Sequence, residues 1–235
     1  MYYIFKSQTL INQKDGDKST LFGKKFIANV KKAYTIHFNE PFPAANRRLH
    51  TILLRSMTDV MEDNRTLIHD KDINFKGLIP ATFAFQLSEI LSSKGLGVKI
   101  KFTNIASEVR NIINLPDPWE VAAMDQFKTS KAKDYFDDSS TLDGIPAYRH
   151  FVPLPIAPFC LDCHGSVEQN PLNAGKDKSQ WTHTDMTGFP LDNWTTDDFG
   201  GGVSVTIYKK DFLELEQLCE LNYISTFVCH FFALE

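Results

Sequence analysis

The distribution of apolar residues predicts helices over much of the first hundred residues. Apolar positions recur every three to five residues over 21–34, and a Pro-Phe-Pro segment at 41–43 ends that pattern. A second amphipathic pattern covers 49–61, with charged side chains on its other face. A third helix is predicted over 77–93, with a proline of the kind that a first turn tolerates. Residues 1–20 are mostly polar and are predicted to form a loose lead-in.

Strand patterns appear in the remainder of the chain. A strand is predicted over 98–103, where apolar and polar residues alternate strictly, another over 147–154, and a third over 203–207, where the alternation recurs after three glycines. Between the first two strands we expect a short helix over 117–127, with an aspartate able to cap its first turn, and then a polar, acidic loop over 135–144. Helices and strands of this kind in one chain predict an α+β fold.

Length and composition restrict the class of protein. A chain of 235 residues with 43% hydrophobic and 23% charged side chains fits one large soluble domain, and no linker or internal repeat divides it. The net charge of -4 argues against a nucleic-acid partner. No apolar run reaches the roughly 18 residues that span a bilayer, and no signal peptide is recognisable. We expect the lead-in, one domain over 21–212, and a helical tail over 213–235.

A Cys-x-x-Cys-His motif at Cys160, Cys163 and His164 carries the strongest chemical signal in the chain. This spacing is the attachment signature of a c-type haem, because one helical turn presents both thiols to the haem vinyl groups and sets the histidine under the iron. A bare Cys-x-x-Cys also occurs in zinc sites and redox dithiols. Zinc would need a second pair at a compatible spacing, whereas Cys219 and Cys229 are ten apart. We predict one covalent haem c, with zinc or a disulfide as the alternative.

The second axial ligand of such an iron has several candidates. His183 and Met186 lie in a stretch without periodicity over 165–199, whose two tryptophans are expected to pack against the haem face. His150 lies on the strand before the motif. Water or an open position is an equal alternative. A strong sixth ligand favours electron transfer or redox sensing, whereas an open site admits small gaseous ligands.

Two arginines are candidates for pairing with the haem propionates. Guanidinium groups match carboxylates bidentately, which makes Arg110 and Arg149 suitable, although either can be an ordinary surface residue. Cys219 and Cys229 can form a disulfide or serve as buried apolar residues. The chain has no Ser-His-Asp order, phosphate-binding glycine loop or His-Glu-x-x-His helix, so no enzymatic activity is expected.

Several blocks, in this order, resemble a known family over about residues 70–210. The blocks are Gly77-Leu78-Ile79-Pro80-Ala81-Thr82-Phe83, Val98-Lys99-Ile100-Lys101-Phe102-Thr103, Val109-Arg110-Asn111, Pro116-Asp117-Pro118-Trp119-Glu120, Tyr148-Arg149 through Pro153, Cys160-Leu161-Asp162-Cys163-His164-Gly165, and Gly201-Gly202-Val203-Ser204-Val205. They are similar to the single-haem c-type sensory domain of bacterial sensor kinases and chemoreceptors, long catalogued as a domain of unknown function.

The resemblance implies a PAS-like antiparallel sheet flanked by helices, a periplasmic or other extracytoplasmic location, and sensing of redox state or a small diatomic ligand. A membrane-embedded signalling partner or a second copy of the chain would receive the signal. The alternative is a small c-type electron carrier with a redox partner. A third possibility is a haem enzyme such as a peroxidase, which would need an open distal site with a positioned acid or base. Two features depart from the family: its members can supply a cysteine from the helix corresponding to 77–93, which has none here, and the 165–199 segment is longer than expected.

Overall fold

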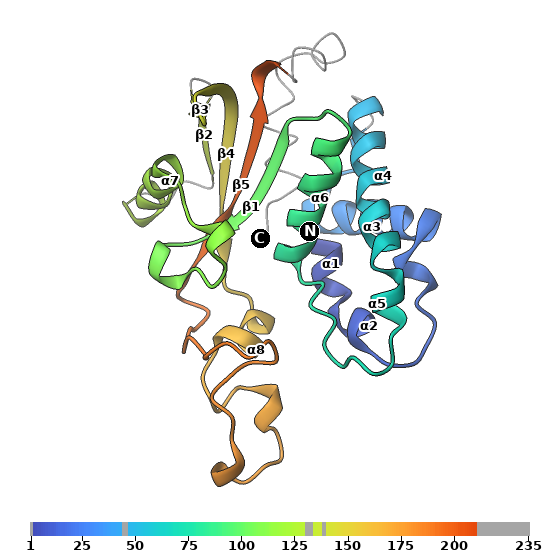
Figure 1. The fold of residues 1–235 in the computed structure, drawn as a ribbon, viewed down its shortest axis with the longest axis vertical. Helices are drawn as coiled ribbons and strands as arrows, with labels where there is room; N and C mark the ends of the chain where they lie inside the picture. Colours follow the sequence, from blue (N-terminus) through green and yellow to red (C-terminus); the bar gives the residue numbers. More distant parts are fainter. Residues whose placement is uncertain (1, 44–46, 130–133, 138–139, 211–235) are drawn as a thin grey trace.

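An open antiparallel sheet lies between one helix on one side and a group of helices on the other (Figure 1). The computed structural model describes residues 2–43, 47–129, 134–137 and 140–210. In these residues the sheet has five strands, and the fold is α+β as predicted. The strands are β1 (Val98–Thr103), β2 (Tyr135–Asp137), β3 (Thr141–Leu142), β4 (Ile145–Pro155) and β5 (Phe199–Tyr208).

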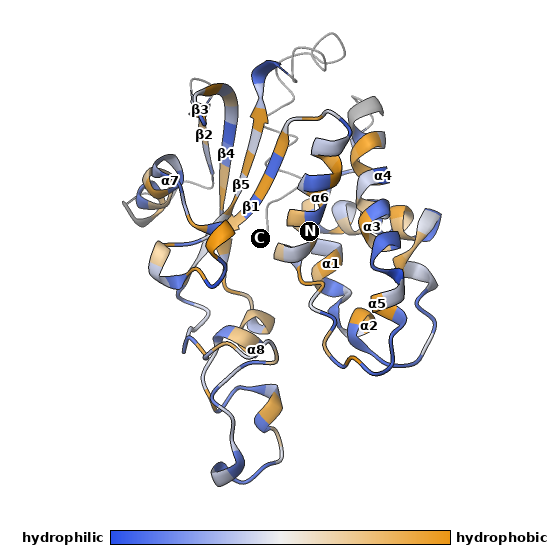
Figure 2. Ribbon diagram, in the orientation of Figure 1, coloured by the Kyte–Doolittle hydropathy of each residue, from blue (hydrophilic) through white to orange (hydrophobic). Residues whose placement is uncertain are grey.

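The sheet order is β1-β5-β4-β2, with β3 paired to β4. The last strand, β5, therefore lies in the middle, where Val205 pairs with Ile100 of β1 on one side and with His150 of β4 on the other. β1 alternates between hydrophilic and hydrophobic residues along its length (Figure 2), as its sequence pattern predicted. This topology leaves the chain between β4 and β5 free to extend beyond the end of the sheet.

The helices other than α8 (Leu161–His164) lie on opposite faces of the sheet, in a larger group on one face and α7 (Pro118–Thr129) on the other (Figure 1). The larger group precedes the sheet in sequence and its buried side chains form one core with Val98, Ile100 and Val205. On the other face, Ala123 and Met124 of the following helix pack against Phe151 of β4. The helices of the larger group are α1 (Tyr2–Lys6), α2 (Gln8–Asn12), α3 (Gly23–Phe38), α4 (Arg47–Asp63), α5 (Arg65–His69) and α6 (Pro80–Ser93).

The helix α6 connects the larger group to the sheet. Phe83, Leu87 and Leu91 lie four residues apart and are buried, which places them on the face that contacts β1. Burial of each such side chain contributes on the order of 1.5–3 kcal/mol. The helix ends where Gly95 takes a φ of +75° and the amide of Leu96 donates to the carbonyl of Leu91. The helix predicted over 77–93 is confirmed from Pro80 onward.

A close approach between strands requires glycine at the start of β5. Gly201 has a φ of +78°, and a Cβ there would overlap the carbonyl of Thr103. A Cβ on Gly202 would overlap the ring of Phe151. These contacts account for two of the three glycines before the 203–207 alternation, because a side chain at either position would separate β5 from a neighbouring element.

The predicted loops were wrong in two places. Within the expected lead-in, α1 and α2 form and bury Ile4 and Ile11 in the main core, against which Tyr3 and Leu10 also pack. The 135–144 segment contains β2 and β3, which pair with β4 and so satisfy their backbone groups. The predicted tail over 213–235, with Cys219 and Cys229, lies outside the described residues. No helix of the described part is both long enough and apolar enough to cross a membrane.

Candidate functional site

The helix α8, which carries Cys163 and His164, lies beyond the end of the sheet (Figure 1), and Cys160 is the last residue of the 3-10 helix directly before it. A short 3-10 helix, Pro158–Cys160, leads directly into α8. The helix ends at Gly165, whose amide donates to the carbonyl of Leu161. A Cβ on Gly165 would lie 2.5 Å from that carbonyl oxygen, so the residue after the motif histidine must be glycine for this turn to close.

The two thiols are half-buried and are free in the structure. Burial raises the pKa of Cys160. Burial, with a further contribution from the nearby Asp185 carboxylate, raises the pKa of Cys163 to about 11. Both groups are therefore protonated at neutral pH, whereas a redox-active dithiol depends on a thiol with a lowered pKa. The environment therefore does not activate either thiol as a nucleophile.

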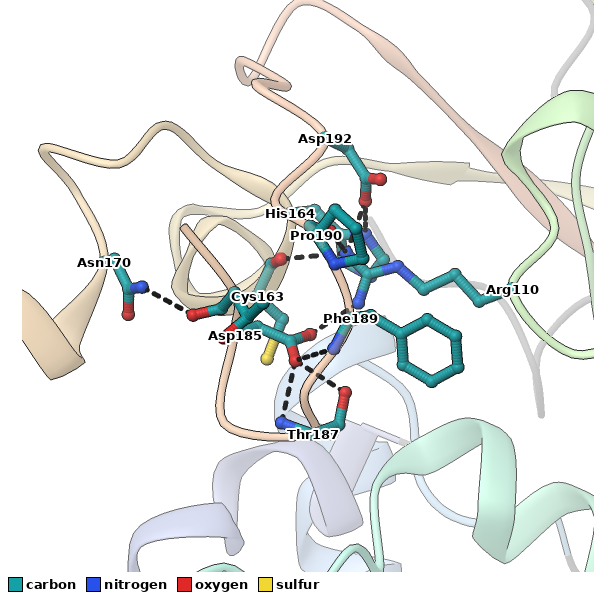
Figure 3. A network of polar contacts seen from close by, with 10 residues as sticks. Arg110, Cys163, His164, Asn170, Asp185, Thr187, Phe189, Pro190 and Asp192 are labelled. Carbon is teal, nitrogen blue, oxygen red and sulfur yellow. Dashed lines mark hydrogen bonds and ion pairs between the residues drawn. The ribbon is translucent and has the colours of Figure 1, made fainter. Parts of the chain in front are cut away.

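His164 is held by contacts in the ring plane and on the ring face. Its Nδ1 lies 2.5 Å from Oδ2 of Asp192 (Figure 3). The indole of Trp194 stacks on the imidazole, with ring centroids 4.5 Å apart and planes 12° from parallel. Burial lowers the pKa of His164, and the hydrogen bond with Asp192 opposes this effect only in part. The imidazole is thus neutral at neutral pH, with Nδ1 donating and Nε2 carrying the lone pair.

Arg110 connects the motif to the loop that follows it (Figure 3). Its guanidinium contacts Asp185 at 2.5 Å and Asp192 at 2.6 Å. It also donates to the carbonyl oxygens of Cys163, at 3.0 Å, and of Pro190, at 3.1 Å. One side chain from the segment between β1 and α7 therefore binds two acidic residues of the loop and the backbone of the motif itself.

Asp185 is the most buried member of this cluster, with a side chain that is 0% exposed. Burial opposes its ionisation, but hydrogen bonds from Thr187 and Arg110 outweigh that effect and hold the pKa of the carboxyl below its usual value. It also accepts a hydrogen bond from the amide of Phe189 (3.2 Å). The buried carboxylate is therefore ionised, and both of its oxygens accept hydrogen bonds.

The segment over 165–199 is ordered by polar contacts rather than by regular structure. Asn173 donates to the carbonyls of Val167 and Thr182, and Asn170 donates to that of Thr184. Its two ends meet at the motif, where the amide of Trp194 donates to the carbonyl of His164 at 2.8 Å. Such a closed loop explains the absence of periodicity, because its structure depends on individual asparagine and aspartate side chains.

The other predicted residues lie in different surroundings. Arg149 is on β4, 2% exposed, and pairs with Asp117 at 2.6 Å while lying over the ring of Trp119. His150 is buried next to it in sequence and bonds to Asp134 at 2.9 Å.

In the loop, His183 is exposed and Met186 is half-buried. The structure therefore brings Arg110 to the motif and gives Arg149 and His150 acidic partners of their own.

Two important residues were not singled out from the sequence. Asp185 and Asp192 lie in the loop without periodicity, and no spacing relative to the motif marks them. Trp194 was expected to pack on the haem face, and it stacks on the motif histidine. Trp181 bonds instead within the loop, to the carbonyl of Lys176. Trp194 was therefore the residue by which the sequence pointed to this part of the site.

The donor chemistry of the site fits a c-type haem. Two free thiols and an imidazole nitrogen lie on two successive short helices, and among the described residues Nε2 of His164 has no hydrogen-bond partner. For the zinc alternative, the described part of the chain contains no group of three or more His, Cys, Asp or Glu side chains arranged to hold a metal ion.

The fold and site together define an α+β domain with a Cys-x-x-Cys-His motif on the connection between its last two strands. The chain belongs to the Tll0287-like family, whose model matches residues 24–207. Among solved structures it is similar to the crystal structure of the cyanobacterial heme-protein Tll0287, with 20% identity and a TM-score of 0.38, over 56% of this chain and 72% of that one. No curated protein matches the chain.

Proposed function

We propose that this domain binds one haem c covalently, through thioether bonds to Cys160 and Cys163, with His164 as the proximal iron ligand. The observation that carries the proposal is the geometry of the motif: both thiols and the imidazole lie on a 3-10 turn and the helical turn that directly follows it, and the hydrogen bond from Nδ1 to Asp192 leaves Nε2 available to iron. Haem in such a site supplies a one-electron redox couple and an iron coordination position for small ligands. The name of the family is that of a protein described as a heme-protein, which supports the proposal.

The domain acts as an extracytoplasmic, PAS-like sensor, with no catalytic activity of its own. Support comes from the antiparallel sheet flanked by helices and from the way the motif is tied to it: Arg110 on the β1–α7 connection binds the motif backbone. A change in iron oxidation or ligation would alter these contacts and reach the sheet. The receiving partner would be a membrane-embedded signalling protein or a second copy of the chain. Coupling of this kind requires two states with different contacts at the haem.

The haem proposal is tested by exporting the chain to a periplasm that contains a cytochrome c maturation system. The purified protein should be coloured and its mass should exceed that of the polypeptide by one haem, under denaturing conditions. The double variant Cys160→Ala/Cys163→Ala should lose the added mass, whereas His183→Ala, an exposed histidine of the same loop, should retain it. A colourless wild-type protein of unmodified mass would refute the proposal.

The sensor proposal is tested on the haem-loaded protein. Absorption spectra of the oxidised and reduced forms, with and without CO or NO, report whether the sixth position is open. Hydrogen exchange of the same forms should differ in the 165–199 loop and in β5. Equal exchange in all forms, together with rapid electron exchange with a redox partner, would instead favour an electron carrier.

A further inference from the structure

We infer that Asp192 is a positioning residue that makes His164 a strongly electron-donating ligand and lowers the reduction potential of the iron. The inference rests on the proposed haem function and concerns how this chain adjusts the site. Its basis is a chain of contacts that runs from His164 to Asp192, then to Arg110 and the buried Asp185 (Figure 3).

The first step is the identity of the hydrogen-bond acceptor. A histidine ligand commonly donates its second ring N–H to a carbonyl, water or carboxylate, and the acceptor affects ligand basicity. Here the acceptor is a carboxylate oxygen 2.5 Å from Nδ1. Hydrogen bonds to ionised acceptors are shorter and stronger than neutral ones. The carboxylate therefore draws the Nδ1 proton toward itself and increases electron density on Nε2.

The second step is the charge of the cluster. Two carboxylates, Asp185 and Asp192, share one guanidinium, so the three groups carry a net charge of −1. Asp185 is fully buried, and Arg110 and Asp192 have side chains only 20% and 21% exposed, so solvent screens this charge incompletely. A nearby negative charge stabilises ferric over ferrous iron, because the ferric site carries one more positive charge. The net negative charge of the cluster and the electron-donating histidine therefore both lower the reduction potential of the iron.

The third step concerns Arg110. Its guanidinium already has four acceptors, the two carboxylates and the carbonyls of Cys163 and Pro190. A guanidinium has five N–H donors. Arg110 thus acts on the iron through Asp192, which it holds in place, rather than mainly through a propionate. Besides Asp185 and Asp192, the described contacts connect one further acidic side chain to His164. This is Glu108, which lies 3.3 Å from the indole nitrogen of Trp194, the residue stacked on the imidazole.

The experiment compares wild-type, Asp192→Asn and Asp192→Glu proteins, each loaded with haem. Spectroelectrochemistry gives the potential, and resonance Raman of the ferrous CO complex reports the strength of the ligand opposite CO. Asp192→Asn should shift the ferric/ferrous equilibrium about tenfold toward ferrous, or about 59 mV upward for a one-electron couple. The resonance Raman spectrum of Asp192→Asn should also indicate a weaker ligand opposite CO. Asp192→Glu should keep a potential and a Raman spectrum close to those of the wild type.

The control is Asp198→Asn, which removes a carboxylate from the same loop that bonds only to Thr195 among the described residues. It should leave the potential unchanged. If Asp192→Asn fails to fold, Asp192→Ser takes its place, since serine is neutral and retains an acceptor. Haem-loaded variants with the wild-type potential would overturn the inference and leave the haem proposal standing. Wild-type protein without haem would overturn both.

Discussion

Trp194 lies flat against the imidazole of His164, 4.5 Å between ring centroids. The two residues are joined a second time through the backbone, where the amide of Trp194 donates to the carbonyl of His164. The indole N–H points to Glu108, on the segment between β1 and α7. The tryptophan therefore fixes the plane of the histidine ring and ties it to a part of the chain that is distant in sequence.

Replacement of Trp194 by alanine should leave haem attachment intact but allow several orientations of the His164 ring. Aromatic pairs of this kind contribute about 0.5–1.5 kcal/mol beyond burial. We expect broadened ferric EPR lines for Trp194→Ala and sharp lines for Trp194→Phe, which keeps the stacked ring. Trp181→Ala, in the same loop but bonded to Lys176, is the control. Sharp wild-type lines in Trp194→Ala would contradict the assigned role.

The two cysteines should contribute separately to attachment. In Cys160→Ser or Cys163→Ser, one thioether bond remains, and the pyridine haemochrome band should move to longer wavelength because one vinyl group stays unsaturated. Haem should resist extraction by acidified acetone in each single variant and be extracted from the double variant. Extraction from a single variant would show that its remaining thiol is not bonded.

Gly201 should be far more sensitive to substitution than Gly175. Both have a positive φ, +78° and +73°, but only at Gly201 would a Cβ overlap neighbouring backbone. Overpacking typically costs about 1–3 kcal/mol. Gly201→Ala should therefore lose that amount of unfolding free energy in urea beyond the loss in Gly175→Ala, which carries the backbone strain alone. Equal losses would show that β5 can move away from Thr103.

Asp117 should make the stability of the protein depend on pH in the acid range. Burial opposes ionisation of Asp117, but hydrogen bonds from Arg149 and from the amide of Glu120 outweigh it and hold its pKa below the ordinary 3.8. A carboxyl with a lowered folded-state pKa contributes stability that is present above its unfolded-state pKa and is lost as the pH falls through the folded-state value.

The matched variant is Asp117→Asn, because asparagine caps a helix about as well as aspartate. Wild type should be more stable than the variant at pH 6, and the difference should shrink from about pH 5 downward. Urea unfolding of both proteins between pH 3 and pH 6 measures this difference in the free energy of unfolding. A difference that does not change with pH would assign the effect to capping alone.

Arg149 should serve stability and not the haem. It is 2% exposed, and its guanidinium faces Asp117 and Glu120. Removal of one partner from a buried ion pair typically costs about 3–5 kcal/mol. Arg149→Gln should show most of this loss with an unchanged haem spectrum, whereas the exposed Arg55→Gln should change neither. A spectral shift in Arg149→Gln would favour a propionate contact instead.

Regular elements with strong patterns could be predicted from the sequence. β1 has the predicted bounds, and α7 begins directly after the aspartate expected to cap it: the amide of Glu120 donates to Asp117 and that of Asp117 to Glu120. The elements missed were short. α1 and α2 are five residues each, and each contributes a single fully buried isoleucine to the core, a signal too weak to detect without the tertiary packing.

The site could be predicted only in part. Cysteine and histidine at fixed spacing carry their chemistry within one turn, so the motif was recognisable. Asp192 and Arg110 come from segments far apart in sequence and meet His164 only through the fold. An aspartate in an irregular loop has no local pattern that reveals its distant partner.

The carbonyl of His164 accepts a hydrogen bond from the amide of Trp194, and that of Gly165 accepts one from the amide of Asn193. The intervening loop therefore begins and ends at the same place. Residues 175–180, at a distance from that point along the chain, are all exposed. A fluorescent reporter or a protease recognition sequence inserted there would extend the loop without separating its ends. Cleavage at such an insertion should yield two polypeptides that stay associated, with the histidine still stacked on its tryptophan.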